Sequence, residues 1–173
     1  MSAKKGQQAV IGFTANYTNR VDKKGRVSVP AQFRALLADS SFPGLFVYES
    51  FILPCLEAAT HEYMDALTEK LATEYGPYDE DYQAFAVSII GAAHALNCDG
   101  EGRILLPHAL LEFARISDAA VFVGCGETLQ IWEPEAWAGH RDAQRRIARE
   151  RVAKLGPIRS RRRPAGEEAG HGA

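Results

Sequence analysis

The sequence has few cysteines and no long apolar run, and both absences exclude classes of protein. Its 173 residues contain only three cysteines, Cys55, Cys98 and Cys125, and no CxxC pair. An odd number of widely spaced cysteines predicts reduced thiols in the cytosol rather than a disulfide framework. No apolar run is long enough to cross a bilayer, and the opening segment MSAKKGQQAVIGF lacks the apolar region of a secretory signal. We expect a cytoplasmic protein without a membrane partner.

Motifs of common enzyme classes are missing as well. The chain contains no HExxH, GxSxG, P-loop or GxGxxG pattern. The five histidines show no metal-ligand spacing: they are His61, His94, His108, His140 and His171. We therefore predict that the protein is not an enzyme and needs no cofactor, metal or small-molecule substrate. Gly124-Cys125-Gly126 superficially resembles a nucleophile turn, so a thiol-dependent hydrolase at Cys125 is one alternative.

Charge is present in both signs but is unevenly distributed. The net charge is only −2, yet residues 1–37 carry +6, residues 38–139 carry −14 and residues 140–173 carry +6. An acidic body with basic ends is not a uniformly cationic surface. The distribution predicts a local contact with a polyanion at one or both ends of the chain.

The most informative pattern is an internal repeat with an offset of 77 residues. NRVDKKGRVSVPAQFRALL at 19–37 matches ALNCDGEGRILLPHALLEFARI at 95–116. The matched pairs are Asp22 with Asp99, Gly25 with Gly102, Arg26 with Arg103, Val27 with Ile104, Val29 with Leu106, and Pro30 with Pro107. A second similarity follows each copy, at 45–54 and 121–134. The repeat predicts two related halves.

Each half is predicted to form strand, tight turn, strand, helix, strand, turn and strand. In the first copy, Asp22 can accept local backbone hydrogen bonds and Gly25 can adopt the positive φ of a bulged hairpin turn. Pro30 then suits the start of a helix, where its missing N–H costs little. Because an isolated hairpin is marginally stable, we expect the halves to interleave their strands in one pseudo-symmetric α+β unit with a β-barrel core and flanking helices.

The remaining segments are predicted from periodicity and composition. Leu56, Ala59, Tyr63, Leu67 and Leu71 recur at helical spacing, and a second helix is expected over 79–95 after the Gly76-Pro77 break. The predicted organisation is a flexible extension at 1–12, a first half at 13–55, a helical insert at 56–94, a second half at 95–135, a C-terminal helix at 136–155 and a disordered Arg-rich tail at 156–173.

The two D-x-x-x-R turns, each followed by an apolar strand and a proline, resemble the MraZ family over about residues 13–155. This resemblance implies two AbrB-like swapped-hairpin units in one chain. It also implies a ring-shaped homo-oligomer that binds short G-rich direct repeats in promoter DNA. Members of the family regulate, usually as repressors, the division and cell-wall gene cluster that includes their own gene. The implied location is the cytoplasm, in association with the nucleoid.

The resemblance places DNA contact on the first turn, at Asp22 and Arg26 together with three flanking cations, Arg20, Lys23 and Lys24. The residues themselves favour the same assignment. The first turn has two lysines between its Asp and Arg, whereas the second has Gly100 and Glu101, and a phosphate backbone needs cations. Asp22 is expected to orient Arg26, which then contacts guanine or phosphate.

Other residues are assigned lesser roles. The second turn, with Asp99, Gly102 and Arg103, is predicted to be structural. Additional phosphate contacts are expected from Lys4, Lys5 and Arg34, and the Arg-rich tail could add non-specific attraction. The alternative to a DNA-binding regulator is an antitoxin-like or protein-interaction module of the swapped-hairpin type, whose helical insert and tail would bind a partner protein.

Overall fold

A computed structural model describes residues 12–157 of the chain. Lys4, Lys5 and the Arg-rich tail therefore lie outside the described residues, as do the predicted extension up to residue 11 and the segment from 158.

The first half contains β1 (Asn16–Arg20), β2 (Arg26–Ser28), α1 (Ala31–Leu37), β3 (Gly44–Glu49) and β4 (Leu56–Ala59). The insert contains α2 (His61–Glu74), α3 (Glu80–Phe85) and the π-helix η1 (Ala86–Ile90). The second half contains β5 (His94–Asn97), β6 (Arg103–Leu105), α4 (His108–Ala114), β7 (Ala119–Gly124) and β8 (Thr128–Trp132), and α5 (Pro134–Leu155) follows.

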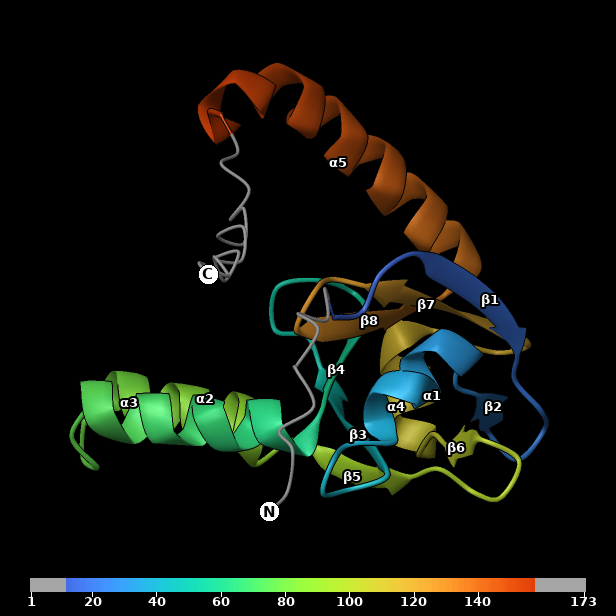
Figure 1. The fold of residues 1–173 in the computed structure, drawn as a ribbon, viewed down its shortest axis with the longest axis horizontal. Helices are drawn as coiled ribbons and strands as arrows, with labels where there is room; N and C mark the ends of the chain where they lie inside the picture. Colours follow the sequence, from blue (N-terminus) through green and yellow to red (C-terminus); the bar gives the residue numbers. More distant parts are fainter. Residues whose placement is uncertain (1–11, 158–173) are drawn as a thin grey trace, which may run out of the picture. The chain divides into compact units, whose positions relative to one another are not determined.

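The predicted order of elements is confirmed in both halves, including the turns and the proline-started helices. Asp22 to Gly25 separates β1 from β2, and α1 begins directly after Pro30. Asp99 to Gly102 separates β5 from β6, and α4 begins after Pro107. The mixed α+β class predicted from the repeat is therefore correct (Figure 1).

The strands pair across the two halves. They form one six-stranded antiparallel sheet in the order β1-β7-β8-β4-β3-β5 and one two-stranded sheet of β2 and β6. The first strand of each half pairs with the third strand of the other: Arg20 lies opposite Ala119 in β1–β7, and Asn97 lies opposite Gly44 in β5–β3. Consequently, neither half forms its sheet alone.

The expectation of a β-barrel is wrong. The six-stranded sheet is open, with β1 and β5 as its two edges, and β2 and β6 form a separate ribbon. An isolated bridge between Val21 and Val27 links the β1 end of the large sheet to the ribbon. Because β2 and β6 pair over only three residues, they cannot continue the ladder of the large sheet around a closed cylinder.

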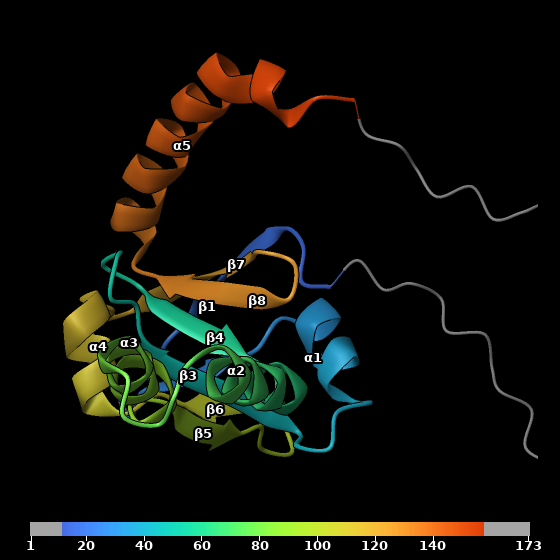
Figure 2. The same ribbon diagram turned by 90° about the vertical axis from the view of Figure 1, so that its left-hand side faces the viewer.

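The main core lies between the large sheet, the ribbon and helices α1 and α4. Its largest fully buried side chains include Phe33, Ile104, Phe122 and Ile131. Figure 2 shows α1 and α4 at the two ends of this layer, as expected for elements that correspond in the repeat. Val27 of β2 faces Ile104 of β6, and both are almost fully buried. The ribbon that carries both turns is therefore anchored in the core by its central pair.

The helical prediction that began at Leu56 is wrong for the first four residues. Leu56–Ala59 is strand β4, paired with both β3 and β8, and α2 begins only at His61 after the cap provided by Thr60. The second predicted helix also ends early, at Ile90, and His94–Asn97 is strand β5. In both places an apolar segment compatible with a helix is instead held by hydrogen bonds to neighbouring strands.

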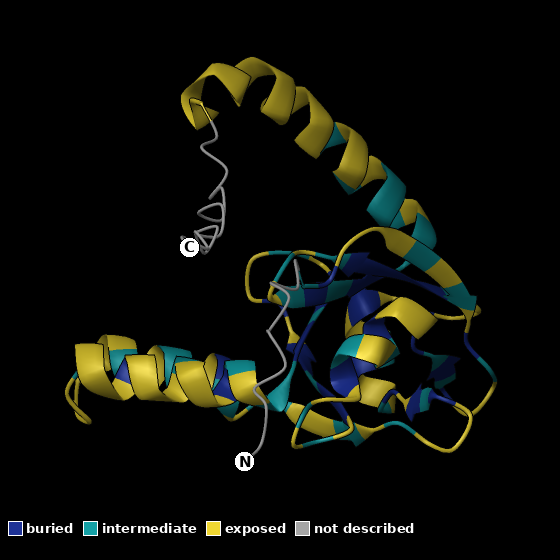
Figure 3. Ribbon diagram, in the orientation of Figure 1, coloured by how far each residue is buried: buried dark blue, intermediate teal, exposed yellow. Residues whose placement is uncertain are grey.

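A smaller apolar cluster holds the insert against the large sheet. Met64 and Ile89 pack with Tyr48 and Ala59 of β3 and β4. Beyond this cluster α2 and α3 run side by side, and their outer faces are exposed (Figures 1 and 3). Within the described chain, residues 12–139 form one compact unit and residues 140–157 belong to a second.

Glu62 connects the loop after α1 to the first turn of α2. Its carboxylate accepts hydrogen bonds from the Ser40 hydroxyl at 2.8 and 3.0 Å and from the Ser41 backbone N–H at 2.8 Å. These donors, the Ser41 N–H above all, lower the pKa of Glu62 from its ordinary value of 4.5 to about 2. The ionised carboxylate is therefore the form that the folded state favours.

We expect Glu62→Gln to flatten the loss of stability in acid. Because the folded pKa lies below the unfolded one, ionised Glu62 stabilises the fold above pH 4.5, and this contribution disappears as the pH falls towards 2. Urea unfolding between pH 2 and pH 6 would measure the change in the free energy of unfolding. Glu69→Gln on the same helix is the matched control, because none of the donors that bind Glu62 reaches it. Identical pH dependence in wild type and Glu62→Gln would contradict this role.

Candidate nucleic-acid interface

The Asp22 carboxylate organises the first turn. Its Oδ1 accepts the backbone N–H groups of Lys24 and Arg26, both at 2.9 Å, and its Oδ2 accepts the Nε–H of Arg26 at 2.6 Å. The Asp22 backbone also closes the turn, because its N–H donates to the Arg26 carbonyl and its carbonyl accepts from Gly25. Gly25 has a φ of +87°, which side chains with a Cβ rarely adopt. Asp and Gly are thus required by the turn itself.

The second turn repeats this geometry. Asp99 Oδ1 accepts the N–H groups of Glu101 and Arg103, and Asp99 Oδ2 accepts the Nε–H of Arg103, all at 2.9 Å. Gly102 has a φ of +75°. In each turn the backbone N–H of the arginine is the largest cause of a lowered pKa of the aspartate, so both carboxylates remain ionised. The Asp–Arg pair by itself is therefore a structural feature of both turns.

The turns differ in what surrounds the arginine. Arg103 forms an ion pair with Glu101, with Nη1 2.9 Å from Oε2, in addition to its hydrogen bond with Asp99, and hydrogen bonding to Asp99 is the largest cause of its raised pKa. Within residues 12–157, Arg26 forms an ion pair with Asp22 alone, through Nε. The terminal nitrogens of Arg26 therefore remain available to a ligand, while Nη1 of Arg103 is already paired with an acid.

The exposed tip of the first turn is cationic. Lys23, Lys24 and Arg20 are exposed, and Arg26 is half-buried with 38% of its side chain accessible. The structure thus brings together the five residues assigned to the first turn on one short hairpin. At the corresponding tip of the second turn, Gly100 and Glu101 are exposed instead. The same scaffold therefore presents opposite charge at its two tips.

Arg34 lies beside the second turn rather than the first. Its Nη1 donates to the Val29 carbonyl at 2.7 Å, and its side chain covers Gly102. At the corresponding place beside Gly25, the second half has Leu111. The long aliphatic part of an arginine can replace a leucine in this way. The position of Arg34 in the repeat, aligned with Leu111, is the sequence signal for this packing.

Two further side chains of the hairpins were not identified from the sequence. Asn19 donates from Nδ2 to the Ser28 carbonyl at 2.7 Å and so ties β1 to β2 behind the first turn. Glu101 neutralises Arg103, as described above. The sequence signal for this pairing is the acid two residues before Arg103, at the position that aligns with Lys24 in the repeat.

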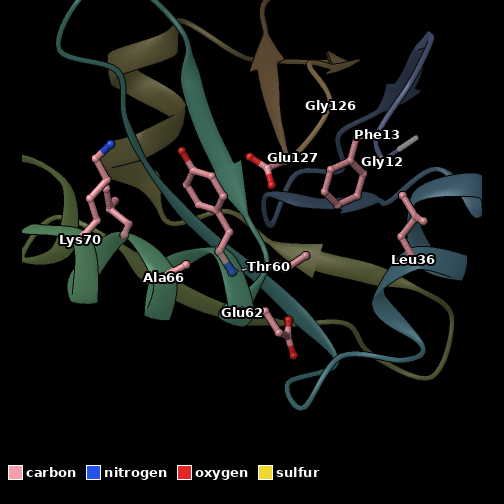
Figure 4. A pocket seen from close by; sticks show the side chains of 11 residues that line it. Gly12, Phe13, Leu36, Thr60, Glu62, Ala66, Lys70, Gly126 and Glu127 are labelled. Atoms are coloured by element: carbon pink, nitrogen blue, oxygen red, sulfur yellow. Dashed lines mark hydrogen bonds between the residues drawn. The ribbon is translucent and has the colours of Figure 1, made fainter. Parts of the chain in front are cut away.

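One hollow of the described surface lies away from both turns. It has a volume of about 560 Å³ and lies between Leu36 of α1, the Thr60–Lys70 stretch around α2, and the β7–β8 turn at Gly126 and Glu127 (Figure 4). Neither D-x-x-x-R turn contributes to its wall. Within residues 12–157 there is no group of three or more His, Cys, Asp or Glu side chains able to hold a metal ion. No helix in that range is both long and apolar enough to cross a membrane.

Cys125 lacks the environment of an activated nucleophile. It lies in the turn between β7 and β8, and its sulfur contacts the Val123 carbonyl at 3.7 Å. Shielding from solvent, followed by the negative charge of Glu57, raises the pKa of the thiol. Catalytic cysteines need the opposite shift, towards the thiolate. The local chemistry therefore favours the first turn over Cys125 as the functional site.

Comparisons with known proteins agree with the family indicated by the two turns. The family model described as "MraZ protein, putative antitoxin-like" matches residues 89–152. A protein named "Transcriptional regulator MraZ" from Rickettsia rickettsii is 40% identical over 143 residues, which are 83% of this chain and 95% of the relative. A protein of the same name from Gluconobacter oxydans is 40% identical over 160 residues, which are 91% of this chain and 93% of the relative. The similarity thus extends over both halves.

Proposed function

This chain belongs to the MraZ family of transcriptional regulators, and on that premise we propose that it binds promoter DNA through its first turn, residues 20–26. One observation carries the proposal. The two turns share a scaffold, but Arg26 keeps its terminal N–H groups among exposed cations while Arg103 forms ion pairs with two acids. A phosphate-rich ligand is therefore attracted by the first tip and repelled by the second.

The chemistry of the first turn divides between reading bases and binding phosphate. Asp22 holds Nε of Arg26 and so fixes the plane of the guanidinium. The remaining N–H groups form a fork suited to guanine O6 and N7 in the major groove, which is wide enough to admit a β-ribbon. Lys23, Lys24 and Arg20 supply charge for the flanking phosphates, which carry no sequence information.

The proposed target is a set of short G-rich direct repeats upstream of the division and cell-wall gene cluster, with repression of a transcript that includes the chain's own gene. One small hairpin makes few contacts, so binding by a single copy is weak. A ring of several copies on repeated sites can raise avidity by about 10²–10⁴-fold, provided that the geometry allows simultaneous contact. Avidity would thus explain both the repeated sites and the ring-shaped homo-oligomer. We also propose that the protein acts in the cytoplasm, in association with the nucleoid.

We also propose that the fold is of the swapped-hairpin type. The pairing of β1 with β7 and of β5 with β3 supports this, because each hairpin contributes its first strand to the edge of a sheet formed with the other half. In this arrangement both turns lie at the ends of one two-stranded ribbon of β2 and β6, in which Ser28 lies opposite Arg103. Loss of either half should therefore disturb both turns.

Titration of a duplex containing the repeats, against a scrambled duplex, tests the function. We expect a preference for the repeats and an affinity that falls linearly with the logarithm of salt concentration, with a slope of about −0.9 for each phosphate neutralised. Light scattering without DNA would measure the number of copies. Failure to form a complex with either duplex in dilute buffer would refute the proposal.

We expect the double substitution Gly100→Lys and Glu101→Lys to strengthen DNA binding. It would copy the lysines of the first turn onto the second and release Arg103 from Glu101. The change should cost little stability, because a side chain at Gly100 meets nothing within 4 Å and Glu101 is exposed. The slope of affinity against salt should steepen by up to about 0.9 for each new phosphate contact.

Gly100→Gln with Glu101→Gln is the matched control for that substitution. It removes the acid without adding cations, and so isolates the release of Arg103. We expect this control to fall between wild type and the lysine variant. If the lysine variant binds no better than wild type, the charge difference between the turns does not decide which one contacts DNA.

A further inference from the structure

The part of α5 that follows Gly139 is strongly basic and exposed. Residues 140–155 contain six Lys or Arg and two Asp or Glu, a net charge of +4. From Gln144 to Leu155 every residue is exposed, as the yellow colour of this helix in Figure 3 shows. Burial against the rest of the described chain therefore does not explain this part of the helix, and its charge is directed to solvent.

Three arginines of this helix share one face. Arg141, Arg145 and Arg149 are spaced four residues apart, which places them along one side at intervals of about 6 Å. Like charges at this spacing destabilise an isolated helix. The arrangement is therefore unfavourable for the helix alone and becomes favourable when a negative partner lies along it.

The charge of this face is not neutralised within the described chain. Arg141 pairs with the adjacent Asp142, with Nε 3.1 Å from Oδ1. Among residues 12–157, neither Arg145 nor Arg149 has an acid within ion-pair distance. Two adjacent turns of the helix thus present unpaired guanidinium groups.

The repeat provides an internal comparison. Helix α2 follows β4 in the first half as α5 follows β8 in the second, but α2 carries four acids and one lysine. Three of those acids already have partners: Glu62 accepts hydrogen bonds from Ser40 and Ser41, Asp65 pairs with His61, and Glu74 pairs with Lys70. The two corresponding helices therefore differ in the sign of their charge and in how far that charge is neutralised by neighbouring residues.

We infer that the face formed by Arg141, Arg145 and Arg149 binds the phosphate backbone of duplex DNA as a second contact, independent of sequence; this inference rests on the proposed function. DNA presents one negative charge per about 1.7 Å of helix axis, whatever its base sequence. A row of arginines can therefore contact phosphates at any position along the duplex. A second copy of the chain is a less favourable partner for this arginine face, because three of the four acids of its α2 already have partners.

Two double variants with equal loss of charge test the assignment. Arg145→Gln with Arg149→Gln removes two arginines of the proposed face. Arg151→Gln with Lys154→Gln removes two cations from the other side of the same helix. We expect the first variant to weaken binding to the repeat duplex and to a scrambled duplex by the same factor, and to reduce the salt slope by about 1.8. The second should retain the wild-type slope.

Several outcomes would overturn this inference. Equal slopes in the two double variants would show that the charge acts diffusely rather than through one face. A change of mass by light scattering in the first variant without DNA, with an unchanged slope, would assign the face to contact between copies. The preference for repeats over scrambled DNA separates this inference from the proposed function: Arg26→Ala should abolish the preference, while Arg145→Gln with Arg149→Gln should retain it.

Discussion

We expect Arg26→Ala to abolish the preference for promoter repeats and Arg103→Ala to leave it nearly intact. A bidentate contact between arginine and guanine contributes about 1–3 kcal/mol of discrimination, which is about 5- to 150-fold for each site. Because several copies would bind a set of repeats, the losses multiply across the assembly. Fluorescence anisotropy with repeat and scrambled duplexes at fixed salt would measure the ratio of the two affinities.

Arg103→Ala is a strict control for this prediction. Arg26 and Arg103 make the same bond to an aspartate four residues earlier, through Nε in both cases. Their removal therefore costs each turn the same bond to aspartate, and Arg103→Ala additionally leaves Glu101 without its cation. A loss of preference confined to Arg26→Ala thus comes from what that arginine presents to the ligand. Equal behaviour of the two variants would contradict the assignment of the first turn.

Arg26→Lys separates base reading from charge in the same experiment. Lysine keeps the positive charge but has no planar fork, so it cannot reproduce a bidentate contact. We expect the variant to lose the preference for repeats while the salt slope stays near that of wild type. An unchanged preference would show that residue 26 contacts phosphate only.

The largest loss of stability is expected for Phe33→Ala, at about 3–5 kcal/mol. Phe33 is 1% exposed, and its ring meets Phe13 and Tyr17 edge-on with centroids 5.1 and 5.5 Å away. These contacts join α1 to β1 and to the segment before it. Removing the ring leaves a cavity among elements that also position the first turn, so DNA binding should fall together with the midpoint of urea unfolding.

Phe113→Ala is the matched control for the aromatic ring. Phe113 lies on α4, the helix that corresponds to α1 in the repeat, but 38% of it is exposed. Its truncation should cost much less than that of Phe33, because less area leaves the core. If both variants unfold at the same urea concentration, the packing of Phe33 between α1 and β1 is not a principal source of stability.

Local features were predicted correctly because their causes lie within a few residues. The turns at Asp22 and Asp99 depend on an aspartate that accepts nearby N–H groups and on a glycine with positive φ. Both helices after Pro30 and Pro107 begin where a residue without N–H is tolerated. Each of these signals needs no information from distant parts of the chain.

Features that depend on distant partners were predicted wrongly or were not identified. Leu56–Ala59 has helical spacing but forms a strand because β3 and β8 flank it on both sides. The sheet is open because the ribbon of β2 and β6 is too short to continue its ladder. Arg34 packs over Gly102, in the other half of the chain, and the residues around position 34 do not indicate that contact; only its alignment with Leu111 in the repeat does.

By itself, the sequence determined the duplication, the positions of the two turns and the difference in their charge, since these follow from residue types at short spacing. Only the tertiary structure decided how the halves exchange strands, that Arg103 is bound by two acids while Arg26 is bound by one, and that the basic part of α5 stays exposed. Strand exchange and burial depend on contacts between residues far apart in the chain, and whether a charge is paired depends on side-chain positions that composition alone does not specify.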